Sequence, residues 1–122
     1  MIFSAKLSDK NLLTEIALKS KAFWDYSDEL IASWKGDLTV SEKMISEMIV
    51  FKYVIDKKTI GFYILNQPNN FSIELEFLFV LPEFIGKGIG NQLLQHAFTK
   101  AILLDCKQIT LLFCLKPFFA FS

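Results

Sequence analysis

The spacing of apolar residues changes twice along this chain, from a helical period to a strand period and back. Apolar residues three and four apart predict helices in the first third, with Ser8 and Asp9 as N-cap candidates, over residues 8–23, 28–34 and 39–48. Alternating or continuous apolar runs predict strands over residues 2–6, 49–55, 59–66, 71–80 and 107–115. A last helix, to about residue 104, is predicted by an apolar stripe at intervals of four: Ile89, Leu93, Ala97 and Ala101.

Two turn signals organise the middle of the chain. Asp56-Lys57-Lys58 and Pro68-Asn69-Asn70 separate three consecutive predicted strands, which indicates an antiparallel meander. The chain has no internal repeat and no linker-like segment. The order of elements predicts one domain over residues 1–122 of the α/β (α+β) class. Its expected architecture is one mixed, mainly antiparallel sheet flanked by helices.

Composition narrows the function classes. The chain has 122 residues, of which 52% are hydrophobic and 21% charged, which fits one folded core rather than disorder. Thirteen lysines balance 13 carboxylates and there is no arginine, so no basic footprint for nucleic acid is expected. A bidentate guanidinium clamp is excluded as well. A phosphate-bearing ligand would be held by backbone N–H groups and lysine charges.

The sequence does not have the patterns that predict a membrane span, a signal peptide or a metal site. No apolar run approaches the roughly 20 residues that cross a bilayer, and the first residues do not resemble a signal peptide, so a cytoplasmic protein without membrane contact is expected. Two cysteines and one histidine do not have the spacing of a metal site, and no metal is expected. Cys106 and Cys114 are interpreted as small buried hydrophobes, and His96 as a solvated surface residue of the last helix.

Three glycines at alternate positions, Gly86, Gly88 and Gly90, lie between a predicted strand and a predicted helix. Glycine adopts positive φ, so successive backbone N–H groups can turn toward one point beside the positive end of a helix. With Lys87 nearby, this pattern predicts an anion cradle. A plain glycine-rich turn is the alternative. The spacing does not fit the Rossmann fingerprint, and the G-K-[ST] of a Walker A loop is absent.

The residues from Glu74 to Leu94 resemble motif A of the GCN5-related N-acetyltransferase (GNAT) family. In that motif a strand ending in Val-x-Pro, here Val80-Leu81-Pro82, is followed by [Gln/Arg]-x-x-Gly-x-[Gly/Ala] at the start of a helix. Gly88 and Gly90 match this pattern, and Ile85 replaces the usual Gln or Arg. The turn Trp24-Asp25-Tyr26 is similar to one found in a bacterial subgroup of the family. The resemblance covers nearly the whole chain.

The resemblance implies an acetyl-coenzyme A-dependent N-acetyltransferase that acts on a small-molecule or protein amine. It implies that the pyrophosphate of the cofactor is held by Ile85, Gly86, Lys87, Gly88, Ile89, Gly90 and Asn91. The pantetheine arm would pair with the end of the preceding strand, formed by Leu78, Phe79 and Val80. Backbone amides there would also polarise the thioester carbonyl, after which the amine attacks the acetyl carbon directly.

The resemblance places a general base at Glu74, six residues before Val80. Strand alternation puts Glu76 on the same face as Glu74, so both carboxylates are catalytic candidates. Either residue could instead be a solvated strand position. By the same resemblance Trp24 and Tyr26 lie on the acceptor side and are candidates for substrate binding. Trp34 is interpreted equally as pocket or core.

The family usually continues with a further helix and two strands, and a tyrosine in that helix protonates the thiolate. Here Phe119 stands where that tyrosine is expected, which leaves water, Tyr63 or Tyr26 as proton sources. We therefore expect a C-terminally shortened family member. We also expect a homodimer through the exposed edge of the strand at 107–115. The alternative function is an acyl-coenzyme A-binding protein with weakened or lost catalysis.

Overall fold

The computed structural model describes residues 1–22, 38–67 and 69–111. The strands are β1 (Ile2–Ser4), β2 (Ile49–Ile55), β3 (Lys58–Asn66), β4 (Ser72–Val80) and β5 (Gln108–Leu111). The helices are α1 (Lys10–Ala22), α3 (Glu42–Glu47) and α4 (Ile89–Leu103), with 3-10 turns η1 (Leu7–Asp9) and η2 (Pro82–Phe84). Within the described part of the chain, no helix is long and apolar enough to cross a membrane.

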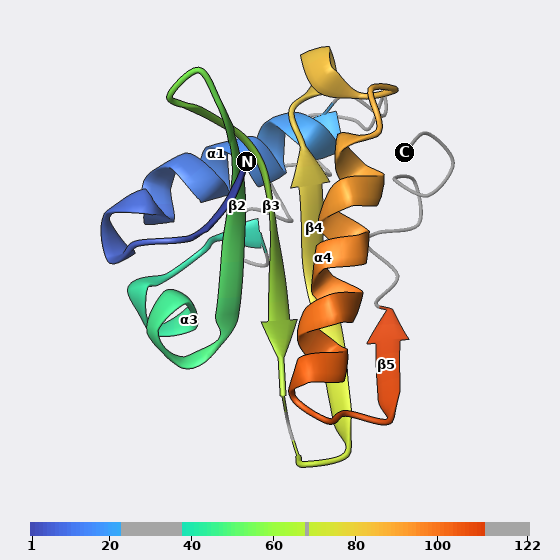
Figure 1. Ribbon diagram of the computed structural model, residues 1–122. Coiled ribbons are helices and arrows are strands. Elements are labelled where there is room, and N and C mark those ends of the chain that lie inside the picture. Colours follow the sequence, from blue (N-terminus) through green and yellow to red (C-terminus); the bar gives the residue numbers. More distant parts are fainter. Residues whose placement is uncertain (23–37, 68, 112–122) are drawn as a thin grey trace.

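The five strands form one sheet in the order β1-β2-β3-β4-β5 (Figure 1). Neighbouring strands from β1 to β4 run antiparallel, and β5 runs parallel to β4. The parallel pair follows from the crossover through α4, which returns the chain to the end of the sheet where β4 began. The predicted meander and the mixed, mainly antiparallel sheet are thus confirmed.

The two long helices cover opposite faces of the sheet (Figure 1). α1 packs behind β3 and β4 in this view, and α4 packs in front of the same two strands. The side chains of β3 are therefore buried on both faces, which explains its nearly continuous apolar sequence. The predicted stripe of α4 is confirmed, since Ile89, Leu93, Ala97 and Ala101 are all buried.

Local sequence signals fix most boundaries. β2 spans the predicted residues, and Ser41 caps α3 by accepting a hydrogen bond from the Met44 N–H at 3.1 Å. β1 is shorter than predicted: it ends at Ser4, and Lys6 is already the N-cap of η1. The helix predicted over 28–34 lies outside the described residues, as does the strand predicted over 107–115 beyond Leu111.

Candidate active site

The loop between β4 and α4 turns on two left-handed glycines. The chain leaves β4 at Val80, and the Leu81 N–H donates to the Ile60 carbonyl at 2.7 Å, which ties the loop to β3. After η2, Gly86 has φ +87° and Gly88 has φ +79°. These are the conformations that glycine adopts without strain, so the sequence pattern and the backbone agree.

The space beside both glycines is open. A Cβ atom built on either Gly86 or Gly88 would meet no atom of the other described residues within 4 Å, its chain neighbours apart. Tight packing against the protein therefore does not explain these glycines, and the vacant side of the loop is where a ligand would lie.

Backbone donors at the start of α4 complete this cradle. Gly88 is the N-cap of α4, and the first helical hydrogen bond runs from the Gln92 N–H to the Gly88 carbonyl at 3.0 Å. The amides of Ile89, Gly90 and Asn91 precede that bond, so they have no acceptor within the helix. Donors at a helix start carry a partial positive charge, which suits a phosphate group.

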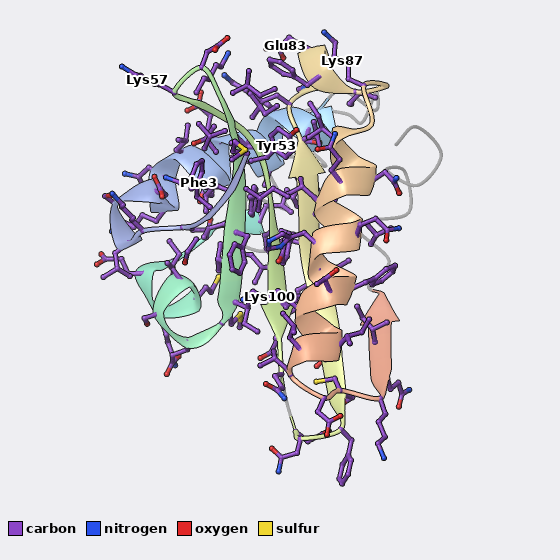
Figure 2. All side chains as sticks on the ribbon, in the orientation of Figure 1. Phe3, Tyr53, Lys57, Glu83, Lys87 and Lys100 are labelled. Carbon is purple, nitrogen blue, oxygen red and sulfur yellow. The ribbon has the colours of Figure 1, made fainter. Side chains whose placement is uncertain are left out.

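Lys87 is exposed between the two glycines, and its ammonium lies 5.6 Å from the centre of the Phe84 ring. The cation–π contact keeps this charge on the loop itself. Figure 2 shows Lys87 at the end of the molecule where α4 starts. It is thus close to the cradle without being buried in it.

A β-bulge interrupts β4 in its centre. Ile64 of β3 lies opposite Phe77, but the next residue, Leu65, lies opposite Leu75. Glu76 is consequently the extra residue on β4. The bulge interrupts the alternation on which the shared face of Glu74 and Glu76 was predicted, and that shared face stays a prediction.

The two carboxylates are nevertheless coupled. Both Glu74 and Glu76 are half-buried, and Oε2 of Glu76 has almost no contact with solvent. Burial raises the pKa of the Glu76 carboxyl, and the negative charge of Glu74 raises it further. A carboxylate with a raised pKa is better matched to accepting a proton near neutral pH.

The side chains at the end of β4 belong to the core. Leu78, Phe79 and Val80 are all buried, with exposed fractions of 2% or less. The described part of β5 pairs with β4 only from Ser72 to Leu75, alongside the first half of the strand (Figure 1). The described part of β5 therefore does not reach the segment expected to contact pantetheine.

His96 is not the solvated residue that was predicted. It is half-buried, its Nδ1 atom lies 2.6 Å from the Tyr63 hydroxyl, and its ring packs 4.8 Å from that of Phe51. Burial lowers the pKa of His96, and the Lys100 ammonium lowers it further, which favours the neutral form of the ring. Burial raises the pKa of Tyr63 well above its usual range, which makes this hydroxyl a poor acid.

Sequence reasoning missed a polar stripe on α4 that contacts the aromatic residues of the sheet. Its members, spaced by four, are Gln92, His96 and Lys100. Gln92 Oε1 accepts a hydrogen bond from the Tyr53 hydroxyl at 2.8 Å, and the Lys100 ammonium lies 5.0 Å from the Phe51 ring centre. Figure 2 shows Tyr53 and Lys100 along this front face. The spacing of four was the available signal.

Several predicted residues lie outside the described ranges: Trp24, Tyr26, Trp34, Cys114 and Phe119. Cys106 is half-buried rather than fully buried, and its sulfur accepts a hydrogen bond from the Gln67 amide at 3.4 Å. Across the described ranges, no group of three or more His, Cys, Asp or Glu residues is arranged to hold a metal ion.

The mixed sheet, whose fourth strand leads through a glycine loop into a helix, places the protein among α+β domains. The sequence matches the model of the acetyltransferase (GNAT) family over residues 13–118, and the chain belongs to that family. No curated protein matches the sequence.

Solved structures agree with this assignment. A PaiA N-acetyltransferase from Thermoplasma acidophilum in complex with coenzyme A is 28% identical, with a TM-score of 0.71 over 82% of this chain and 70% of that chain. An integron cassette protein from the mobile metagenome of V. cholerae is 26% identical, with a TM-score of 0.62 over 92% and 74% of the two chains.

A GNAT family acetyltransferase from Elizabethkingia anophelis with acetyl-CoA bound is 21% identical and shows the same fold, with a TM-score of 0.64 over 91% of this chain. The chain spans 63% of the length of that protein.

Proposed function

We propose that the protein is an acetyl-coenzyme A-dependent N-acetyltransferase. The observation that carries this proposal is the open cradle, in which left-handed Gly86 and Gly88 precede the free amides of the first turn of α4. Two similar structures contain coenzyme A or acetyl-CoA, which supports a cofactor of this chemistry.

The backbone amides from Gly86 to Asn91 would bind the pyrophosphate, and Lys87 would add one positive charge. The Ile85 N–H donates to the Pro82 carbonyl at 3.3 Å, so it is not a further donor for the ligand. Backbone binding suits a chain without arginine, because it needs no guanidinium. A side chain at Gly86 or Gly88 would enter the space that the phosphates occupy. The residues present therefore fit the pyrophosphate of the cofactor.

The two carboxylates of β4, Glu74 and Glu76, would provide the general base for the acceptor amine. The acceptor nitrogen forms a bond to the acetyl carbon, the carbon–sulfur bond breaks, and the thiolate leaves with the bonding electrons. Glu76, whose pKa is raised by burial and by Glu74, would take the proton released by the amine, directly or through water. Backbone amides at Leu78 to Val80 would stabilise the developing charge on the carbonyl oxygen.

Water is the proton source that we favour for the leaving thiolate. Tyr63 contacts His96, and burial raises the pKa of its hydroxyl, so it does not suit the role of an acid. A coenzyme A thiol resembles the cysteine thiol, with a pKa of about 8.5, and its thiolate is a tolerable leaving group without a dedicated acid.

Calorimetry with coenzyme A and a thiol-release assay over a panel of amines test this proposal together. We expect one-site binding and amine-dependent thiol release that Glu76→Gln lowers at least about tenfold, within the range of general base catalysis. Lys43→Gln, on the exposed surface of α3, is the control and should leave both readouts unchanged. Binding without release would favour the acyl-coenzyme A-binding alternative, and no binding would refute the cradle.

We further propose self-association through the edge of the sheet at β5. β5 is the outer strand of the described sheet, and Phe71, Ile102 and Leu103 near its start are largely exposed, at 69%, 74% and 73%. Exposed apolar groups beside a strand edge favour pairing with a second copy. Light scattering at micromolar concentration should give a dimer that Leu103→Asp dissociates and Leu7→Asp, on η1, does not. A monomeric parent protein would refute this proposal.

A further inference from the structure

A pocket of about 340 Å³ opens between α1, the β2–β3 turn and η2, and none of Gly86, Lys87 and Gly88 lines it. Its floor is apolar and buried, formed by Ile16 of α1 and Leu81 after β4, with exposed fractions of 1% and 5%. A buried floor below an open rim is typical of small-molecule sites.

The rim of this pocket carries more positive than negative side chains. Three lysines (Lys19, Lys57 and Lys58) and two glutamates (Glu15 and Glu83) line it, which leaves one positive charge in excess. The Lys19 ammonium forms an ion pair with Glu15 at 2.8 Å, and the negative charge of Glu83 also raises the pKa of Lys19. Among the described residues, neither Lys57 nor Lys58 has an ion-pair partner.

Lys57 is held in an unfavourable conformation. The two central residues of the turn, Asp56 and Lys57, have φ of +50° and +67°, where glycine or asparagine is preferred. The turn therefore carries a strained residue that places a cation at the rim of the pocket. Figure 2 shows Lys57 and Glu83 at the same end of the molecule, on the turn and on the loop. A two-residue hairpin turn requires positive φ at both of its central residues, and Ile55 pairs with Lys58, so this turn geometry fixes Lys57 at the rim.

We propose that this pocket binds a small organic monocarboxylate with an apolar body. Its negative charge would be neutralised by Lys57 and Lys58, and its body would cover Ile16 and Leu81. The site is separate from the cradle, but its occupant would contact the segment that leads into it. The Phe84 N–H donates to the Leu81 carbonyl at 2.9 Å, so Leu81 belongs to the same hydrogen-bonded turn. The proposal does not depend on the transferase function.

Calorimetry of the full chain with hexanoate tests the proposal. We expect one-site binding, weaker binding of acetate, which lacks the apolar body, and no binding of hexylamine, which carries the opposite charge. Lys58→Gln should weaken hexanoate binding about fivefold, as expected for the loss of one partly exposed charge contact. Lys43→Gln should leave it within about twofold of the parent value.

Lys57→Gly separates binding from folding. Glycine relieves the positive φ, so this variant should raise the melting temperature while it weakens hexanoate binding about fivefold. A general loss of folding would lower both quantities and cannot produce this combination.

Binding at saturating coenzyme A identifies the site. Hexanoate affinity should be the same with and without coenzyme A, and Gly88→Ala should leave it unchanged. Displacement by coenzyme A would place the probe in the cradle and overturn the proposal. Absence of binding, equal binding of hexylamine, or binding that neither lysine variant weakens would also overturn it.

Discussion

Replacing Gly88 by Ala separates the two properties that we assign to the cradle, its backbone conformation and its open space. Gly88 has φ +79°, and an L-residue in the left-handed region costs roughly 1–2 kcal/mol. Among the described residues, the added Cβ meets no atom within 4 Å beyond its chain neighbours, so no packing clash there adds to this cost. We therefore expect the free energy of unfolding to fall by about 1–2 kcal/mol, with the protein still folded.

The effect on coenzyme A should exceed the effect on stability, because the Cβ occupies the space proposed for the pyrophosphate. Loss of one hydrogen bond to a charged group costs about 1.5–3 kcal/mol, which corresponds to a rise in Kd of about 10- to 150-fold. Urea titration measures the first quantity and calorimetry with coenzyme A measures the second. Both are done at 25 °C, where the variant is folded.

A matched control distinguishes local from global effects. Ile64→Val, at a fully buried position of β3, should lose about 0.5–1.5 kcal/mol of stability and leave coenzyme A affinity within about twofold. If Gly88→Ala bound coenzyme A as tightly as the parent protein, the assignment of the open side of this loop to the ligand would be refuted.

Three further predictions concern stability. Tyr63→Phe removes the hydroxyl that contacts His96, and denaturant titration should show a loss of about 1 kcal/mol; no loss would mean that this contact is energetically silent. Because the pKa of His96 is lowered, the unfolded chain takes up a proton first as the pH falls below 6.5, so stability should decline there. His96→Gln should flatten that decline, and equal slopes would contradict the assignment. Burial works to raise the pKa of Asp9, but the N–H of Lys6 and the ammonium of Lys52 outweigh it and the pKa is lowered. Stability should therefore fall further below pH 3.8, and Asp9→Asn should remove this component in an acid titration.

Local patterns were sufficient for the elements on which the site is built. The strand period and turn residues predicted β2, β3 and β4 closely, because alternation and turn chemistry act over a few neighbouring residues. The role of the glycines at 86 and 88 could be predicted for the same reason, because glycine itself allows positive φ. The apolar stripe of α4 likewise identified its buried face.

Contacts between distant segments decided the rest. The bulge at Glu76 depends on how β3 and β4 align, and one extra residue shifts the register of the side chains beyond it. The contact between Tyr63 and His96 joins residues 33 positions apart. A tyrosine and a histidine in the sequence do not by themselves indicate that the polar side of α4 contacts aromatic side chains of the sheet.

The sequence by itself determined the kind of elements, their order, the glycine loop and the family to which the chain belongs. Only the tertiary structure decided which carboxylate occupies the bulge, how far His96 is withdrawn from water, and which lysines gather around the pocket beside η2. The physical reason is the separation along the chain of the residues that set each property. Backbone preference and hydrophobic period are set by adjacent residues, whereas burial, pKa and cavity shape are set by segments that meet only after folding.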